Sequence, residues 1–225
     1  MNPNFFIIGA PKSGTTAMAH YISTHPNVYF STIKELQFFS DDIQTAKSEM
    51  IPKNMSEYLK NFKDADPDTH KIVAEGSTQY LRSKKAIKNI TDNFDAPKFL
   101  VMLRNPVQAV HALHMEALYG FNESEKDFEK AWFNSIETQK RIQNIKEPID
   151  DHTLYAHIAS YYQQVERLLM EVPKESVMIL TFDEFVEDTK KSYELLLNFL
   201  GLDSDNKNDF EIINSSHAHR WEFIS

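Results

Sequence analysis

The chain has 225 residues, of which 41% are hydrophobic, and this is enough for one compact domain with a substantial core. It has no cysteine, which excludes disulfide bonds and thiolate metal sites and suits a reducing compartment. The net charge of −9 and the lack of a basic stripe argue against nucleic-acid binding, and no apolar stretch approaches the ~18 residues of a membrane span, so we expect a soluble, cytoplasmic protein.

The first predicted strand, Phe5–Ile8, leads into a loop with Gly9 and Gly14, and a helical pattern follows. This arrangement is typical of a phosphate site, because backbone N–H groups converge on the anion and glycine lets the backbone approach it. The glycines have the spacing of the nucleoside triphosphatase loop, but that loop has a lysine directly after its second glycine, where this chain has Thr15. The only lysine of the loop is Lys12, which indicates a ligand whose reacting group is not a γ-phosphate.

Three further short apolar runs are predicted to be strands buried on both faces, with longer amphipathic stretches between them. The runs are Ile72–Ala74, Phe99–Leu103 and Val177–Leu180. The predicted helices are Val107–Leu118, Asp127–Asn144, Tyr155–Met170 and Phe185–Leu200, with Gly201 as a helix stop. This alternation predicts an α/β fold of three layers, with a mainly parallel central sheet flanked by helices and a ligand site beyond the carboxyl ends of the strands.

Several segments carry a resemblance to a known family when they are taken in order. They are Pro11-Lys12-Ser13-Gly14-Thr15-Thr16, Lys34-Glu35-Leu36-Gln37-Phe38-Phe39, Glu75-Gly76-Ser77-Thr78-Gln79-Tyr80-Leu81, Phe99-Leu100-Val101-Met102-Leu103-Arg104-Asn105-Pro106-Val107 and Val177–Phe185. The set resembles sulfotransferases that use 3′-phosphoadenosine 5′-phosphosulfate (PAPS), and the soluble, bacterial-type members of the carbohydrate branch in particular. The resemblance implies a P-loop NTPase-like sulfotransferase fold in a single domain over residues 1–225.

The resemblance also implies roles for individual residues. Residues Pro11, Lys12, Ser13, Gly14, Thr15 and Thr16 would bind the 5′-phosphosulfate of PAPS. Arg104 would bind the 3′-phosphate, Lys12 would stabilise the bridging oxygen, and Glu35 would be the catalytic base. The implied reaction moves a sulfuryl group from PAPS to a hydroxyl or amine of a small-molecule or carbohydrate acceptor. It releases adenosine 3′,5′-bisphosphate and requires no metal.

The residues themselves are compatible with these roles but leave alternatives open. Phe38-Phe39 would anchor the Glu35 segment in the core while the carboxylate faces a cleft, although an exposed glutamate paired with a lysine gives the same pattern. Arg104 precedes Asn105-Pro106, where a helix begins, so its guanidinium can reach a phosphate at the helix N-terminus. A salt bridge to a nearby carboxylate is the alternative there.

Further contacts to substrate or cofactor are expected from Lys34, Ser77, His111, His114 and Arg220. The two histidines lie three residues apart on one predicted helix, and on such a helix packed or solvent-facing histidines are the more frequent case.

Three features depart from the family pattern. Family members usually have a serine eight residues after the 3′-phosphate arginine, where this chain has Ala112, so one hydroxyl contact is missing unless another residue supplies it. The branch that sulfates heparan-type chains often has a lysine at the position of Gly76. Members also commonly continue past the position of Ser225, so a closing segment over the cofactor is lacking or lies outside this sequence.

Two other classes of function remain open. A small-molecule or nucleotide kinase would use the same loop for ATP–Mg²⁺, and Thr15 argues against it. A non-catalytic PAPS-binding protein is compatible with Ala112, but a binding protein has no need of a base at Glu35. The negative charge also disfavours a long polyanionic acceptor, and the sequence does not identify the acceptor or the oligomeric state.

Overall fold

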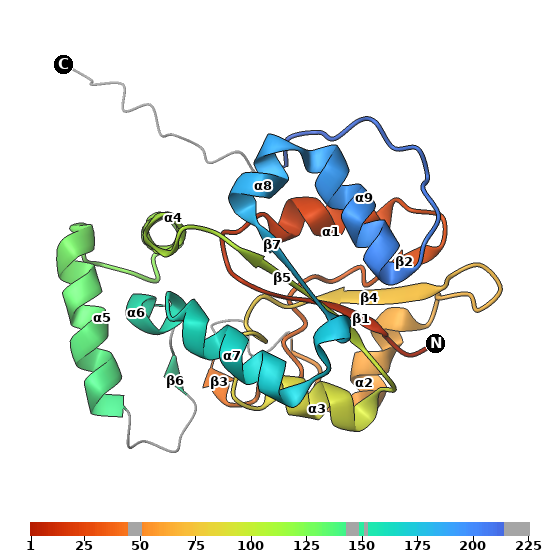
Figure 1. Ribbon diagram of the computed structural model, residues 1–225. Helices are drawn as coiled ribbons and strands as arrows, with labels where there is room; N and C mark the ends of the chain where they lie inside the picture. The colour runs from red at the N-terminus through yellow and green to blue at the C-terminus, as the bar shows by residue number, and fades with distance from the viewer. Residues whose placement is uncertain (45–50, 143–148, 151–152, 214–225) are drawn as a thin grey trace.

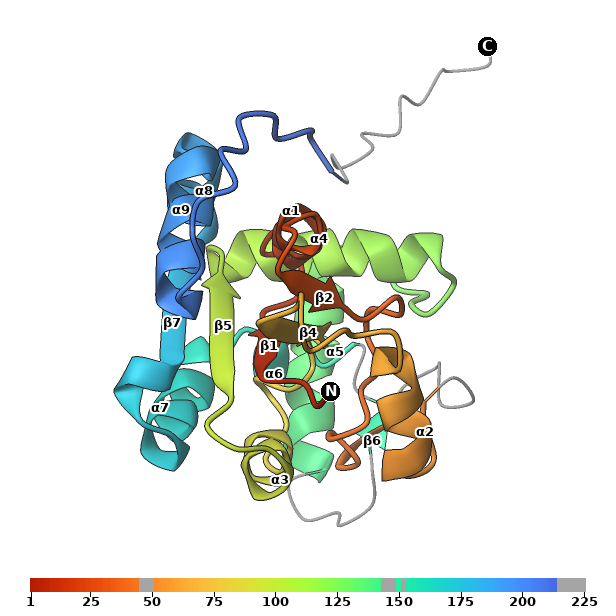
Figure 2. The same ribbon diagram turned by 90° about the vertical axis from the view of Figure 1, so that its right-hand side faces the viewer.

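The computed structural model describes residues 1–44, 51–142, 149–150 and 153–213, and a five-stranded sheet lies at its centre (Figure 1). In spatial order the strands are β2 (Val28–Phe30), β4 (Ile72–Gly76), β1 (Phe5–Gly9), β5 (Lys98–Leu103) and β7 (Val177–Thr181), and each neighbouring pair is parallel. The turned view follows this order from β7 at one edge to β2 at the other (Figure 2). Two short strands, β3 (Ile43–Gln44) and β6 (Ile149–Asp150), form a separate parallel pair. The predicted parallel α/β fold is confirmed.

The central strands are buried on both faces, as their unbroken apolar runs predict. In β1, Phe5 and Ile7 belong to one core cluster, whereas Phe6 and Ile8 belong to another. Two helix layers cover these clusters, as Figure 1 shows. The first layer contains α1 (Thr15–Ser23), α8 (Phe182–Glu187) and α9 (Thr189–Leu200), and the second contains α2 (Met55–Leu59), α3 (Ala86–Asn93) and α7 (Tyr161–Glu171).

A third, smaller cluster lies beside the sheet and joins α4 (Pro106–Tyr119), α5 (Phe128–Ile142) and α6 (Tyr155–Ile158). Its buried members are Val110, Ala131, Tyr155 and Ile158. Figure 1 shows α5 outside the two main helix layers. The predicted helix over 127–144 corresponds to α5, and its last residue, Asn144, lies outside the described residues.

Two of the predicted helices are wrong in the same way, because the structure divides each predicted range between two separate helices. Tyr155–Met170 is interrupted at Ala159 and Ser160, where the side-chain amide of Gln164 donates to the carbonyl oxygen of His157 at 2.8 Å. That carbonyl, at the end of α6, also accepts from the Ser160 N–H at 3.2 Å. Phe185–Leu200 is interrupted at Asp188, whose carboxylate accepts from the Lys191 N–H at 2.9 Å and so caps α9.

The predicted stop at Gly201 is confirmed, since this residue ends α9 with a φ of +75°. The sequence patterns missed several short elements, which are β2, β3, β6, α2, α3 and the 3₁₀ turns η2 (Lys60–Phe62) and η3 (Lys174–Ser176). For α2 a signal existed: Asn54 accepts from the Glu57 N–H at 2.9 Å, which is the pattern of an N-cap followed by an acidic third residue. Among the described helices, none is long and apolar enough to cross a membrane.

Candidate active site

The loop that the sequence predicts to bind phosphate, here called the phosphate loop (Pro11 to Thr16), lies between β1 and α1, and packing holds its second glycine. Gly14 is the N-cap of α1 with a φ of +87°, and a Cβ at this position would lie 3.2 Å from the rings of Phe182 and Phe185. No side chain caps α1, and its first turn contains no acidic residue. The N–H groups at this helix start are therefore available to an anion. Ser13 and Thr15 are buried in the loop, while Lys12 and Thr16 are exposed and Pro11 is half-buried.

Lys12 and Arg104 are neighbours at this loop, as predicted from their positions after two strands. The Nη1 group of Arg104 donates to the carbonyl oxygen of Lys12 at 3.3 Å. The Lys12 ammonium lies 3.3 Å from Oε2 of Glu116 on α4. The guanidinium of Arg104 lies 4.5 Å from the ring centre of Phe182, and its Nε donates to Gln108 at 3.4 Å. Two cations thus stand next to the start of α1.

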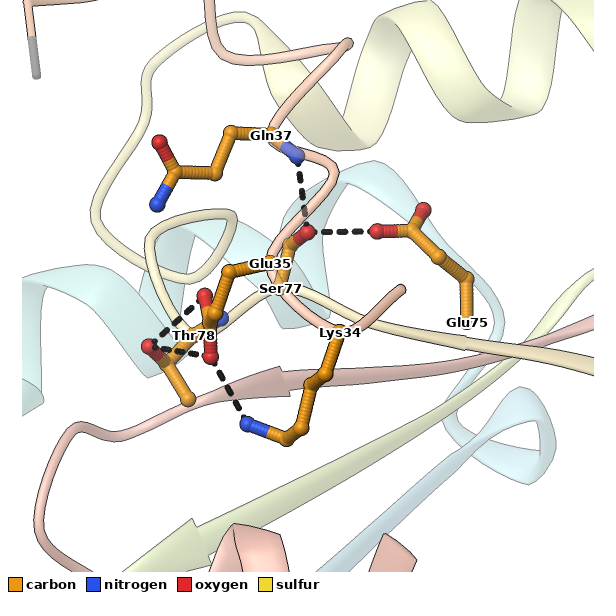
Figure 3. A network of polar contacts seen from close by, with 6 residues as sticks. All are labelled: Lys34, Glu35, Gln37, Glu75, Ser77 and Thr78. Carbon is orange, nitrogen blue, oxygen red and sulfur yellow. Dashed lines mark hydrogen bonds and ion pairs between the residues drawn. The ribbon is translucent and has the colours of Figure 1, made fainter. Parts of the chain in front are cut away.

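The segment after β2 brings Glu35 to the end of β4, the strand that pairs with β1. The backbone N–H of Glu35 donates to the Gly76 carbonyl at 2.8 Å. Its carboxylate accepts from the Thr78 N–H at 2.9 Å and from the Thr78 hydroxyl at 3.2 Å. The Lys34 ammonium lies 2.7 Å from Glu35 Oε1. Figure 3 shows the side chains of Glu35, Thr78 and Lys34 turned toward one another.

Lys34 reaches this position across the bare backbone of Gly76. A Cβ on Gly76 would lie 3.3 Å from Cε of Lys34 and 3.2 Å from the ring of Phe30. Gly76 therefore leaves room for the Lys34 side chain, which carries a cation to the strand end where the resemblance expects a lysine in the heparan-sulfating branch.

Glu75 lies on the other side of Ser77 from Glu35 and has no contact with solvent (Figure 3). One of its carboxylate oxygens accepts from the Ser77 hydroxyl, and the other accepts from Tyr58 at 3.0 Å and Tyr80 at 3.1 Å. Burial raises the pKa of Glu75 to about 7, against the opposing effect of these three hydroxyl groups.

The other expected contact residues lie in different surroundings. Ser77 is fully buried, and its hydroxyl is engaged by Glu75 and by the Gln37 N–H. His111 is exposed beside the ring of Phe128. His114 is buried in the third cluster, where its Nε2 lies 2.7 Å from the Glu125 carbonyl. The histidines are thus on α4 but packed against the α5 side, and the structure does not bring them together with Glu35.

Arg220 lies outside the described residues. Within the described parts of the chain, no group of three His, Cys, Asp or Glu side chains is placed to hold a metal ion.

Sequence reasoning missed Tyr161, the first residue of α7. Its hydroxyl is buried and makes no hydrogen bond of normal geometry to any residue that the structure describes. Burial raises the pKa of Tyr161, and Ser13 and Arg104 are close enough to act in the opposite direction. An unpaired buried hydroxyl costs about 1–3 kcal/mol, so its position beside the phosphate loop and Arg104 suits an additional acceptor atom there. Nothing in the sequence marks this residue, because α7 follows the loop by well over a hundred positions.

Phe182 and Glu116 were also missed, although one of them had a signal. Phe182 follows Thr181, and Thr181 and Glu184 form a reciprocal capping box at the start of α8. That box fixes the first turn of α8, which presents Phe182 to both Gly14 and Arg104. Glu116 has no comparable pattern in the sequence.

Comparison with known proteins gives a consistent result. The family described as "Sulfotransferase domain" matches residues 2–220. A sulfotransferase from Alicyclobacillus acidocaldarius has a similar structure, with a TM-score of 0.83 and 26% identity over 96% of this chain and 87% of that one. Mouse sulfotransferase SULT7A1, solved in complex with PAP, shares the fold at 13% identity and a TM-score of 0.51, over 91% of this chain and 61% of that one.

Among curated proteins, the bifunctional heparan sulfate N-deacetylase/N-sulfotransferase 1 of Caenorhabditis elegans is 29% identical over 115 residues. The match covers 49% of this chain and 12% of the nematode protein, so the chain spans a small part of that relative's length.

Proposed function

The chain belongs to the sulfotransferase domain family, and on that premise we propose that it transfers a sulfuryl group from PAPS to a hydroxyl or amine acceptor. The observation that supports this proposal most is the grouping of three features at one edge of the sheet. The start of α1, which no described side chain caps, follows β1. Arg104, whose guanidinium packs on the Phe182 ring, follows β5. The Glu35 carboxylate and the neighbouring Lys34 ammonium lie at the end of β4. Ligands of parallel α/β sheets bind at this edge.

The residues at the edge suit a donor with two anionic ends. PAPS supplies a sulfuryl group that is already activated for in-line transfer to a nucleophile. The loop from Pro11 to Thr16 would hold the 5′ end, and Arg104 would hold the 3′-phosphate with its free guanidinium N–H groups. The unpaired hydroxyl of Tyr161 supports this fit, because a phosphate oxygen between Ser13 and Arg104 would give it a partner.

Glu35 and Lys12 would carry the chemistry. Charge builds on the leaving oxygen in the loose transition state of such a transfer, and a cation at the loop offsets it. Lys12 has an exposed ammonium in the loop that can exchange its Glu116 partner for that oxygen. Glu35 would accept the proton of the acceptor as the new bond to sulfur forms, and adenosine 3′,5′-bisphosphate would leave. Its bonds from Thr78 fix the direction of the carboxylate.

For the acceptor we propose only a broad class, which is a small molecule or a carbohydrate. The name of the nematode relative, a heparan sulfate N-deacetylase/N-sulfotransferase, supports an amine on a carbohydrate. The net charge of −9 makes a long polyanionic chain the less favourable acceptor.

The experiment that tests this function is the Glu35→Gln variant. We expect PAPS turnover with a panel of hydroxyl and amine acceptors to fall by about 100-fold or more, while the affinity for adenosine 3′,5′-bisphosphate changes less than about twofold, because the base is not part of the proposed nucleotide contacts. Glu175→Gln is the matched control, since Glu175 is exposed in η3 at the opposite end of the strands. A Glu35→Gln protein with wild-type turnover would remove the assignment of the base.

A further inference from the structure

Glu75 is the one described residue at this edge whose carboxyl group is fully buried, and the proposed reaction gives it no task. It has no exposed surface and so cannot touch a substrate. It nevertheless accepts hydrogen bonds from three hydroxyl groups, those of Ser77, Tyr58 and Tyr80. The ionised form of a carboxylate can accept from all three at once. A carboxyl group at this depth is costly unless its oxygens are hydrogen-bonded, and this network gives partners to both of them.

The Ser77 hydroxyl connects this carboxylate to the segment that carries Glu35. While it donates to Glu75, its oxygen accepts from the backbone N–H of Gln37 at 2.9 Å. A hydroxyl that donates to a carboxylate becomes a better acceptor, because linked hydrogen bonds polarise one another. The chain of contacts therefore runs from Glu75 through Ser77 to the backbone two residues after Glu35, as Figure 3 shows.

The segment needs such an anchor because its backbone is strained. Glu35 has a φ of +68° and Gln37 a φ of +55°, and neither is a glycine. A non-glycine residue in this region is strained, because its Cβ crowds the following carbonyl oxygen. The Ser40 hydroxyl, within the segment, donates to the Gln37 carbonyl at 3.0 Å, and contacts from outside the segment add to this bond. The Gly76 carbonyl holds Glu35 from one side and the Ser77 hydroxyl holds Gln37 from the other.

We propose that Glu75 is a positioning residue, which acts through Ser77 and the Gln37 N–H to keep the Glu35 carboxylate turned toward Thr78 and the reacting groups. This inference rests on the proposed role of Glu35 as base. It gives a role to Glu75 of β4 and to Ser77 and Tyr80 in the segment after β4, none of which takes part in the proposed reaction. Tyr58 of α2 and Tyr80 donate to the other oxygen of Glu75, and the charge of Glu35 disfavours ionisation of Glu75.

The test compares Ser77→Ala with a matched control. Ser135 is also a buried serine whose hydroxyl accepts from a backbone N–H, that of Ala156 at 3.0 Å, but it lies on α5 in the third cluster. Hydrogen exchange of the Gln37 amide is measured without any ligand. We expect exchange about tenfold faster in Ser77→Ala and unchanged in Ser135→Ala. In the same variants we expect kcat to fall about 10- to 100-fold only for Ser77→Ala, with the affinity for adenosine 3′,5′-bisphosphate retained.

A double-mutant cycle then tests whether Glu75 acts through Ser77. Glu75→Gln should lower kcat in the wild-type background and have little further effect in the Ser77→Ala background. Additive losses would overturn the inference, as would an unchanged Gln37 amide in Ser77→Ala. Faster exchange with an unchanged kcat would overturn it as well, since Glu35 would then not need this anchor. A failure of the proposed function looks different, because the wild-type protein itself would then show no PAPS turnover.

Discussion

Arg104 is held in place by contacts with three other residues of the chain. The ring of Phe182 lies under its guanidinium, and the Lys12 carbonyl and Gln108 each accept one of its N–H groups. A planar guanidinium fixed in this way loses little conformational freedom when it binds a phosphate. This contact with the Arg104 guanidinium gives a role to Phe182, the residue directly after β7.

The first prediction concerns Arg104→Ala. We expect the variant to bind adenosine 3′,5′-bisphosphate about 10- to 100-fold more weakly, because a bidentate contact to phosphate is lost. Binding of adenosine 5′-phosphate should change much less, since it lacks the 3′ group. Calorimetric titration of both nucleotides into both proteins measures the difference. Equal losses for the two ligands would show that Arg104 does not contact the 3′-phosphate.

The second prediction concerns Tyr161→Phe, which has effects of opposite sign on stability and binding. Without ligand, the variant should be as stable as the wild type or more stable by about 1 kcal/mol, because an unpaired buried hydroxyl is removed. Its affinity for the bisphosphate should fall about tenfold, because a hydrogen bond to a charged group is lost. Thermal unfolding and calorimetry measure the two effects. Tyr162→Phe is the control, since that neighbouring hydroxyl is exposed and bonded to Glu166. Weaker stability with unchanged affinity would contradict the fit of Tyr161 to the donor.

For individual site residues, the sequence alone predicted the positions of some and gave no indication of others. Lys12 and Arg104 could be placed together because both follow strands of a parallel sheet, and they do lie in contact. Glu35 could be identified from its segment. Its left-handed backbone and its bonds to Thr78 could not be predicted, because both depend on the end of β4. Tyr161 and Glu116 could not be found, because long-range packing alone brings them to the loop.

Among the elements, the junction of β1 and α1 is the most constrained. Gly14 has a left-handed backbone, and a Cβ on it would lie 3.2 Å from the rings of Phe182 and Phe185, which is closer than ordinary van der Waals contact. The helix start therefore approaches those rings only because the residue is glycine. By contrast, Gly201 has a similar left-handed φ at the end of α9, but a Cβ there would meet nothing within 4 Å.

The third prediction uses these two glycines as a matched pair. Gly201→Ala should cost about 1 kcal/mol of folding free energy and leave nucleotide binding unchanged, since only the backbone is strained. Gly14→Ala should cost more, because the methyl group also displaces Phe182 or Phe185, and it should weaken bisphosphate binding by at least about tenfold. Denaturant unfolding and calorimetry test both. Equal stability losses with unchanged binding would show that the packing around Gly14 does not shape the loop.

The hydrophobic pattern of the sequence predicted the strands and the long helices of this chain, but it did not predict the breaks within the helices. The apolar runs of β1, β4, β5 and β7 matched the observed strands to within a residue or two. The interruptions at Ser160 and Asp188 depend on a buried glutamine and on an aspartate cap, which a hydrophobic pattern does not register. The short β2 was missed because three residues give too little pattern.

For the molecule as a whole, Glu75 couples folding to pH. A carboxyl whose pKa rises on folding, here from 4.5 to about 7, binds its proton more tightly in the folded protein. Its contribution to stability is therefore complete below about pH 4.5 and is lost as the pH rises through about 7.

The fourth prediction follows from this coupling. The free energy of unfolding should fall by roughly 3 kcal/mol more in the wild type than in Glu75→Gln between pH 4.5 and pH 8. Urea unfolding at several pH values in that range gives the two curves. If the curves run parallel, folding does not raise the pKa of Glu75, and its carboxyl is ionised in the folded protein throughout this range.

The overall architecture also explains how an acidic protein could bind a highly anionic donor. The net charge is −9, but Lys12, Arg104 and Lys34 all follow strands at one edge of the sheet, together with the start of α1. Strand alternation in the sequence was sufficient to predict that edge. The order of the strands and the acceptor surface were not predictable, since they depend on contacts between distant segments.

The most direct test of the central claim is calorimetric titration of the protein with adenosine 3′,5′-bisphosphate, ATP–Mg²⁺ and adenosine 5′-phosphate. The account predicts micromolar binding of the bisphosphate and at least about tenfold weaker binding of the other two, because only the bisphosphate has groups for both the loop and Arg104. Preferential binding of ATP–Mg²⁺ would contradict the account and indicate a kinase, and no binding of the bisphosphate would show that this chain does not use PAPS.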